Sequence, residues 1–276
     1  MPEELQPIGV FDSGLGGLTV LRKLMMHLPN ERFVYLGDTA RVPYGNKSAE
    51  TVRKYAAECA AFLLDHDVKL IVIACNTVSA VALESLRYHL PVPVLGVIEP
   101  AARQAAQVSP SGRIGIVGTR ATIASGVYEQ GIHAHRSDAA VMSQACPLFV
   151  PLVEEGWLDT DATRLVARTY LNPLLAQRID TLVLGCTHYP LLSPLIQEMA
   201  PGVRLIDCGE AASVQAAQTL NVAWINGVTD TTRSFAQLYL TDYTPTFQLI
   251  ARELLGMNVQ EPTRVTLSEY SLPDAP

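Results

Sequence analysis

Short apolar runs alternate with longer amphipathic segments along the chain. The apolar runs, rich in valine, isoleucine and leucine, predict β-strands at residues 8–11, 33–37, 70–74, 93–97, 114–117, 140–142, 181–185 and 203–206. Between them, apolar residues recur at helical spacing, as in the two sets Leu18, Leu21, Met25, Leu28 and Val52, Tyr55, Cys59, Phe62. Continuous apolar strands that alternate with amphipathic helices indicate mostly parallel sheets covered on both faces. The pattern therefore predicts an α/β fold.

The strand pattern repeats itself. The segment IVIACNTVSA (71–80) resembles TLVLGCTHYP (181–190), and the cysteines in these two segments are 111 positions apart. VPVLGVIEP (92–100) echoes VRLIDCGEA (203–211) at almost the same offset, and IGVFDSG (8–14) resembles IGIVGTR (114–120). The repeat predicts two pseudo-symmetric, doubly wound lobes. Because ligands bind at the carboxyl ends of strands in such sheets, we expect the active site in the cleft between the lobes.

The repeat also suggests where the lobes divide. We expect a first boundary at Glu99-Pro100, after the fourth strand, and a second near Asp207–Cys208. Residues 208–276 contain helix-like segments at 210–219, 231–239 and 246–255, without a full strand–helix set, and we expect them to pack back on the first lobe. The first lobe then comprises 1–98 plus 208–276, and the second comprises 99–207.

Composition narrows the class of protein. The 276 residues are 49% apolar and 17% charged, with a net charge of −7, so binding to nucleic acid or to an anionic membrane through bulk electrostatics is disfavoured. Neither a signal peptide nor an apolar stretch approaching the roughly 20 residues of a membrane span is recognisable. Five scattered cysteines without a C-x-x-C pair disfavour a disulfide framework and a structural zinc site. We therefore expect a cytoplasmic protein without a metal ion.

Cys75 and Cys186 are the main candidates for chemistry. A single cysteine after an apolar run is most often a small buried hydrophobic residue. The interpretation changes when two cysteines match. Each is expected where a strand is followed by a helix N-terminus, and a helix N-terminus favours a thiolate. Facing thiols suit a reaction that needs one acid and one base on opposite sides of a carbon atom. The other three cysteines are interpreted as structural: Cys59, Cys146 and Cys208.

Two ionisable residues lie next to these candidates in the motifs. Asp12 either caps the following helix or places a carboxylate beside one thiol, and we favour the second interpretation slightly. His188, two residues after Cys186, is either an ordinary buried or surface histidine or a partner for that thiol.

The glycine-rich segments give little support to nucleotide binding. Gly14, Gly16 and Gly17 superficially resemble a dinucleotide fingerprint, but Thr19 stands where the third glycine is expected. Residues 45–48 (GNKS) lack the upstream glycine of a P-loop and are better interpreted as a turn into a helix.

Seven motifs, in order along the chain, carry a resemblance to a known family. They are FDSGLGGLTV, YLGDTARVPYGNKS (35–48), ACNTVSA, GVIEPA, GIVGTRATI, ACPLFVPLVEEG (145–156) and LGCTHYPLL. Together they resemble the glutamate racemases, of the aspartate/glutamate racemase superfamily. The resemblance extends from residue 8 to about residue 210.

This resemblance implies interconversion of L- and D-glutamate without a cofactor, by two bases, supplying D-glutamate for peptidoglycan. It implies that Cys75 is the base for D-glutamate and Cys186 is the base for L-glutamate. Asp12, His188 and Glu154 would assist them. The residues that it places around the substrate are Asp12, Ser13, Pro43, Tyr44, Gly45, Asn76, Thr77, Thr119, Thr122, Thr187 and His188. The physical chemistry agrees, because small polar residues and backbone amides can stabilise a carbanion-like state and the substrate carboxylates.

A pyridoxal phosphate enzyme is disfavoured by the lysines. All four lie in the first quarter of the chain and none lies near the paired cysteine motifs. We therefore expect no cofactor, and a small molecule, glutamate, as the partner.

Two rival functions stay open at this point. An aspartate or hydantoin racemase would share the thiol pair but differ in pocket length, although the Thr187-His188 pair and the PYG motif favour glutamate. Alternatively, the chain acts mainly as a binding protein, since some relatives restrain DNA gyrase. Because its surface is acidic, it would then bind the gyrase protein rather than the DNA. The sequence leaves the oligomeric state open, with a homodimer as one option.

Overall fold

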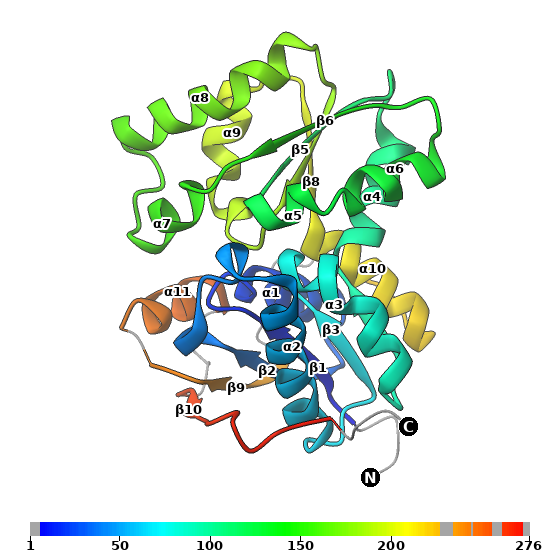
Figure 1. Cartoon of the computed structure of the whole chain (residues 1–276), viewed down its shortest axis with the longest axis vertical. Coiled ribbons are helices and arrows are strands. Elements are labelled where there is room, and N and C mark those ends of the chain that lie inside the picture. The colour runs from blue at the N-terminus through cyan, green and yellow to red at the C-terminus, as the bar shows by residue number, and fades with distance from the viewer. Residues whose placement is uncertain (1–5, 227–233, 244, 256–260, 273–276) are drawn as a thin grey trace.

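A computed structural model describes residues 6–226, 234–243, 245–255 and 261–272. The chain forms two parallel sheets, one above the other, each flanked by helices (Figure 1). The larger sheet has the strand order β10-β9-β2-β1-β3-β4, and the smaller has the order β6-β5-β7-β8. The prediction of a two-lobed α/β fold is confirmed.

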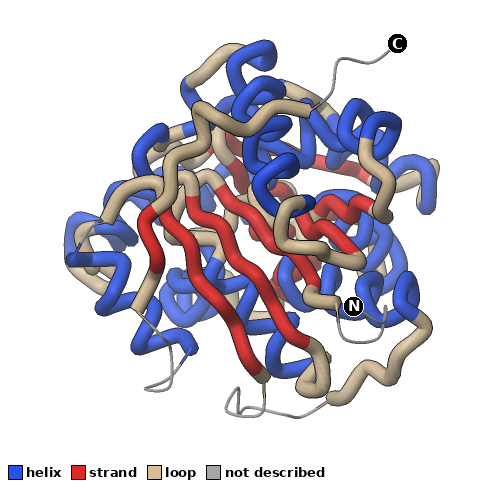
Figure 2. The backbone as a smooth tube through the Cα atoms, turned by 90° about the horizontal axis from the view of Figure 1, so that it is seen from below, coloured by secondary structure: helices blue, strands red, loops and turns tan. Residues whose placement is uncertain are grey.

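The larger sheet forms the first lobe. Its strands are β1 (Ile8–Asp12), β2 (Arg32–Gly37), β3 (Leu70–Ile73), β4 (Val94–Gly96), β9 (Phe235–Leu240) and β10 (Thr263–Arg264). Helices α1 (Leu18–His27), α10 (Cys208–Leu220) and α11 (Pro245–Leu255) contribute to the core on one face, and α2 (Ala49–Leu64) and α3 (Asn76–His89) to the core on the other. Seen from below, the strands of this sheet run side by side between helices (Figure 2). Strands β1 and β3 are buried throughout, which explains why their sequences are continuous apolar runs.

The smaller sheet forms the second lobe. Its strands are β5 (Arg113–Gly118), β6 (Ala140–Ala145), β7 (Thr181–Gly185) and β8 (Arg204–Asp207). Helices α4 (Ile98–Val108) and α6 (Val127–His135) contribute to the core on one face. The other face is covered by α7 (Phe149–Glu154), α8 (Asp161–Ala176) and α9 (Ser193–Met199). A short helix, α5 (Arg120–Ala124), follows β5.

The internal repeat corresponds to equivalent strands. The order β2-β1-β3-β4 in one sheet matches the order β6-β5-β7-β8 in the other. Cys75 follows β3 and Cys186 follows β7, so the two thiols occupy equivalent places in the two lobes. This pseudo-symmetry is the structural origin of the sequence repeat.

The helix that follows the fourth strand of each lobe packs on the other lobe. Helix α4 leaves β4 and packs against α6, whereas α10 leaves β8 and packs against α1. One apolar core, which includes Ile114 from the second sheet and Val72 from the first, therefore runs through both lobes. Glu99-Pro100, expected as a boundary, lies in the first turn of α4 rather than in a loop.

The segment after residue 208 departs from the sequence-based prediction in one place. The helices expected at 210–219 and 246–255 are present as α10 and α11, but the helix expected at 231–239 is wrong. Residues 235–240 form β9, in which Ala236, Leu238 and Leu240 are buried alternately and pair with β2. Residues 231–233 lie outside the described part of the chain. Burial of every second residue is typical of a strand. In the sequence this alternation was obscured by the polar residues that precede the strand.

Candidate active site

Cys75 and Cys186 line one small inner chamber at the facing carboxyl ends of the two sheets. The chamber has a volume of about 40 Å³ and is also lined by Ser13, Tyr44, Asn76, Thr77, Thr187 and His188. It shares Val42, Pro43, Gly45, Thr119, Val150 and Glu154 with an outer pocket of about 260 Å³. The inner chamber has room for only about three water molecules. The space beside the thiols is therefore narrow, and it continues towards a larger mouth.

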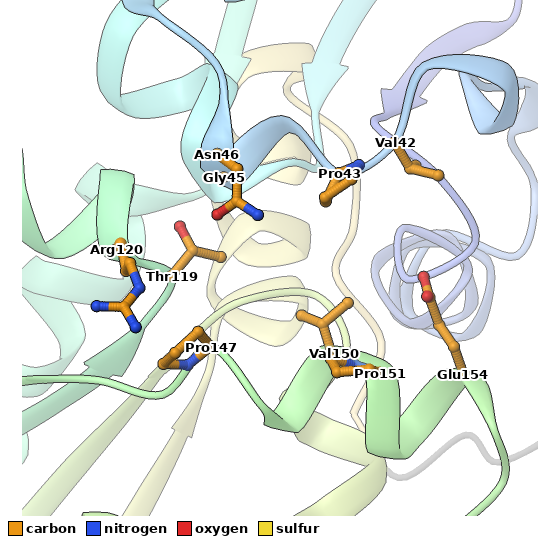
Figure 3. Close-up of a pocket in the computed structure, with 10 residues that line it drawn as sticks. All are labelled: Val42, Pro43, Gly45, Asn46, Thr119, Arg120, Pro147, Val150, Pro151 and Glu154. Carbon is orange, nitrogen blue, oxygen red and sulfur yellow. The ribbon is translucent and has the colours of Figure 1, made fainter.

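The mouth is formed by segments from both lobes. Figure 3 shows the loop that carries Val42, Pro43, Gly45 and Asn46 facing Pro147, Val150 and Pro151 across the pocket. Thr119 and Arg120 lie at one end, and Glu154 lies at the other. Substrate that enters must therefore pass between the two lobes.

Cys75 lies at the N-cap of α3, as predicted. Its thiol donates to the Ser13 hydroxyl at 3.5 Å, and the backbone amides of Thr77 and Val78 point to the sulfur. Burial raises the pKa of Cys75 to about 11, with a further increase from the charge of Asp12, while Ser13 and the amides act in the opposite direction. The α3 N-terminus thus partly offsets the cost of an anion at this sulfur.

Cys186 has a different environment, although its strand is equivalent. A 3-10 helix, η4 (Tyr189–Leu192), follows it, and α9 starts only at Ser193, so the predicted helix N-terminus at this cysteine is a 3-10 turn. Pro190 and Pro194 at the starts of these two helices account for the break. Burial raises the pKa of Cys186, and the backbone amide of His188 lowers it. The charge of Cys75 also raises it, so ionisation of one thiol disfavours ionisation of the other.

His188 lies beside Cys186, as predicted, and connects it to Glu154. Its Nδ1 is 3.8 Å from the Cys186 sulfur, and its Nε2 is 3.2 Å from the Glu154 Oε1. A proton on Nε2 that is donated to Glu154 leaves the Nδ1 lone pair facing the thiol. The arrangement is that of a base oriented by a carboxylate.

Asp12 orders the loop before α1, although the helix itself has no side-chain cap. Its Oδ2 accepts hydrogen bonds from the amides of Gly14 at 3.0 Å and Gly17 at 2.9 Å, which orders the loop before α1. Burial raises the pKa of Asp12, and the charge of His188 and these amides lower it. Its charge also raises the pKa of both thiols. Asp12 is therefore a buried carboxylate that both orders its loop and acts on the thiols.

The glycine run in this loop brings the lobes into contact. A Cβ atom at Gly16 would lie 2.4 Å from the Thr187 Oγ1 and 2.5 Å from the His188 Nδ1. Thr19 donates its hydroxyl to the Thr187 carbonyl at 2.8 Å. Glycine at position 16 therefore permits close approach to the Cys186 loop, rather than contact with a nucleotide.

Three threonine hydroxyls from the two lobes also meet at the site. The Thr77 Oγ1 lies 3.1 Å from that of Thr119 and 3.3 Å from that of Thr122, and the Thr119 and Thr122 hydroxyls are 3.0 Å apart. Beside them, Asn76 has a buried Nδ2 without a partner among the described residues. These groups offer hydrogen-bond donors to a carboxylate.

The loop with Pro43, Tyr44 and Gly45 is held from behind. The buried Tyr44 hydroxyl donates to Asp38, whose other oxygen accepts from the Thr241 hydroxyl at 2.9 Å. Residues 44–46 form a 3-10 turn and Ser48 caps α2, so the predicted turn into a helix is confirmed. The segment after β9 thus supports the substrate-facing loop.

All but two of the residues predicted for the site line the inner chamber or the outer pocket; Asp12 and Thr122 lie directly behind the chamber. The sequence analysis missed the mouth residues Val42, Asn46, Arg120, Pro147, Val150 and Pro151. Val42, Asn46 and Arg120 adjoin predicted residues in the motifs, which was the available signal. Cys208, interpreted as structural from the sequence, has a polar neighbour, because its sulfur is 2.9 Å from the Tyr128 hydroxyl.

The raised pKa of Cys75 leads to a testable expectation. Thiolates, not thiols, react with iodoacetamide, so alkylation of Cys75 should accelerate about tenfold for each pH unit between pH 7 and pH 10. Peptide mass spectrometry measures the rate at Cys75, and a cysteine in a short unstructured peptide is the control, expected to level off near pH 9. Levelling off of Cys75 below pH 9 would contradict the assigned pKa.

Among the described residues, no group of His, Cys, Asp and Glu side chains could hold a metal ion. In the same part of the chain no helix is long and apolar enough to cross a membrane.

Comparisons with known proteins place this geometry in a family. The family model described as Asp/Glu/Hydantoin racemase matches residues 8–216. A glutamate racemase from Syntrophus aciditrophicus is 49% identical over 265 residues, covering 96% of this chain and 98% of that protein. Among solved structures, glutamate racemase from Francisella tularensis in complex with D-glutamate matches with a TM-score of 0.86 and 38% identity, over 97% of this chain and all of that one. Glutamate racemase from Thermus thermophilus in complex with β-chloro-D-alanine matches with a TM-score of 0.80 and 43% identity, over 97% of this chain and 99% of that one. The chain belongs to the Asp/Glu/hydantoin racemase family, and within it to the glutamate racemases.

Proposed function

We propose that this enzyme interconverts L- and D-glutamate by a two-base mechanism that needs no cofactor. The observation that carries the proposal is the pair of thiols that follow equivalent strands of two pseudo-symmetric lobes and line the same small chamber. The glutamate racemases to which the chain is similar support glutamate as the substrate.

Each thiol serves one face of the substrate. With D-glutamate, the Cys75 thiolate removes the Cα proton and the Cys186 thiol gives its proton to the opposite face, which leaves Cys75 protonated and Cys186 as the thiolate. L-glutamate reacts by the reverse transfer. The charge of Cys75 raises the pKa of Cys186, which suits this cycle because it favours one thiolate and one thiol over two thiolates. His188, oriented by Glu154, takes the proton of Cys186 when that thiol has to act as the base.

The remaining polar residues bind the substrate and stabilise charge. The Cα–H bond is weakly acidic, so the carbanion-like state has to be stabilised by fixed donors in a water-poor site. The Asn76 amide nitrogen, which has no partner in the described part of the chain, and the hydroxyls of Thr77 and Thr119 are such donors. Ser13, Thr187 and the loop Pro43–Gly45 also line the chamber. Thr122 supports Thr77 and Thr119 from behind.

Entry of glutamate requires the lobes to move. The inner chamber is far smaller than the substrate. We therefore propose that the two lobes, one formed by 1–98 plus 208–276 and the other by 99–207, separate to admit the substrate and then close on it. The hinges for this movement would lie near Glu99–Pro100 and Asp207–Cys208. In the cell, the enzyme is proposed to act in the cytoplasm and to supply D-glutamate for peptidoglycan, and a homodimer is the proposed assembly.

Independence from cofactors is tested with the purified chain. After exhaustive dialysis against a chelator, racemisation of glutamate, followed by optical rotation, should continue at the original rate. A panel with aspartate and hydantoins should show much slower turnover than glutamate. Activity that disappears on dialysis and returns with a metal ion, a nucleotide or pyridoxal phosphate would refute cofactor independence, and preference for aspartate would move the chain to a sibling activity.

A further inference from the structure

The two ends of the Asn76 side chain have different surroundings. Its Oδ1 accepts a hydrogen bond from the Tyr128 hydroxyl at 2.6 Å, whereas its buried Nδ2 has no partner among the described residues. Asn76 directly follows Cys75 and lines the inner chamber. An amide group in this position can offer either a donor or an acceptor to the substrate, depending on which way it is turned.

The contacts behind Asn76 decide that orientation. The Cys208 thiol donates to the Leu184 carbonyl at 3.2 Å and also lies 3.8 Å from the Asn76 Oδ1, and its sulfur lies 2.9 Å from the Tyr128 hydroxyl. Since the thiol proton is used by a carbonyl, the tyrosine proton is available for the Asn76 Oδ1. Burial raises the pKa of Tyr128, so its hydroxyl keeps that proton.

The opposite orientation of the amide is unfavourable on the substrate side, because it would present a carbonyl oxygen to an anionic substrate. It would also turn Tyr128 from a donor to Asn76 into an acceptor, since a hydroxyl can act as either. In the orientation that the structure shows, the Tyr128 hydroxyl and the Cys208 thiol both face the Asn76 Oδ1, at 2.6 Å and 3.8 Å, and the Nδ2 is left for the substrate.

We propose that Tyr128 is a positioning residue, whose hydroxyl holds the Asn76 amide with Nδ2 available to donate to a carboxylate of the amino-acid substrate. The inference rests on the proposed racemase function. Tyr128 belongs to α6 in the second lobe and Asn76 to α3 in the first, so this hydrogen bond also joins the two lobes directly behind the chamber. Cys208, at the start of α10, lies beside Tyr128 and does not line the inner chamber.

The variant Tyr128→Phe keeps the aromatic ring and removes only the hydroxyl. We expect KM for glutamate to rise about tenfold in both directions, with a smaller change in kcat, because a donor to a charged group is no longer fixed. The same substitution in an Asn76→Ala background should have little further effect. Calorimetric titration with D-glutamate provides the dissociation constant in any variant that turns over too slowly for a KM.

Tyr189→Phe is the matched control. This tyrosine is also fully buried, but its hydroxyl donates to the Cys146 carbonyl at 2.8 Å and does not contact Asn76. Tyr189→Phe should lower the melting temperature about as much as Tyr128→Phe does. Its KM for glutamate should stay close to that of the unsubstituted chain.

The outcomes separate this inference from the proposed function. If the unsubstituted chain does not racemise glutamate, the proposed function is wrong. If it does, and Tyr128→Phe leaves KM and the dissociation constant unchanged, or weakens binding equally with and without Asn76, Tyr128 does not act through Asn76 and the inference is overturned.

Discussion

Replacing either Cys75 or Cys186 with serine should lower the racemisation of glutamate by about 10³-fold or more while the fold stays intact. A hydroxyl has nearly the shape of a thiol but is far less acidic, so one of the two proton transfers loses its competent group. Both side chains are almost fully buried at the chamber, so solvent cannot replace them. Polarimetry measures racemisation, and circular dichroism checks the fold. The control is Cys146→Ser, since that thiol donates to the Gln144 carbonyl and lies outside the chamber; its activity should be close to that of the unsubstituted chain.

The two serine variants should differ in the enantiomer that they still accept. With a glutamate analogue that carries a β-leaving group, removal of the Cα proton by the surviving thiolate is enough for elimination. Cys75→Ser should therefore eliminate from the L-form alone, and Cys186→Ser from the D-form alone. Equal behaviour of both variants toward both enantiomers would rule out the two-base arrangement, and full racemisation by either would remove that cysteine from the mechanism.

Gly16→Ala should reduce kcat about 100-fold, because small displacements at a catalytic group have effects of this size. The added Cβ would overlap with the Thr187 hydroxyl and the His188 ring. Neither can move away freely, since Glu154 holds the ring and Thr19 holds the Thr187 carbonyl. The substitution should therefore push His188 away from Cys186 and impair the reaction of L-glutamate, for which Cys186 is the base, at the step that His188 assists.

The control for Gly16→Ala is Gly202→Ala, a glycine outside the active site with φ of 81°. Alanine there is strained by the left-handed backbone but meets no neighbour within 4 Å. It should lower the melting temperature and leave kcat unchanged. If Gly16→Ala retains full kcat, the close approach of its loop to His188 has no part in catalysis.

Much of this architecture could be predicted from the sequence because central strands of both sheets, such as β1, β3 and β7, are buried on both faces. Strands such as β3 and β7 are continuous apolar runs, and the repetition of their ends placed Cys75 and Cys186 at equivalent positions. Strand β9 was missed because it is half-exposed at Phe235 and Gln237, and its pairing with β2 is a contact over about two hundred residues that no local pattern reveals.

The contacts behind the site were also inaccessible from sequence. Tyr128 and Cys208 are 80 positions apart and come together only because α6 and the start of α10 meet behind Asn76. Likewise, the different surroundings of the two thiols could not be derived from their matched motifs. Two prolines after Cys186 convert the expected helix start into a 3-10 turn, and His188 takes the place of the helix N-terminus as the partner of that sulfur.

The central claim, that two thiols act on opposite faces of the same carbon, is tested most directly by racemisation in deuterium oxide. Chiral chromatography followed by mass spectrometry at early times should show deuterium at Cα of the product enantiomer, while the remaining substrate still carries its original hydrogen, because the acid that protonates the product is a different group from the base. The result should hold from L- to D-glutamate and from D- to L-glutamate. Transfer of the substrate's own hydrogen into the product, or equal early labelling of substrate and product, would show that a single base serves both faces and would contradict the account.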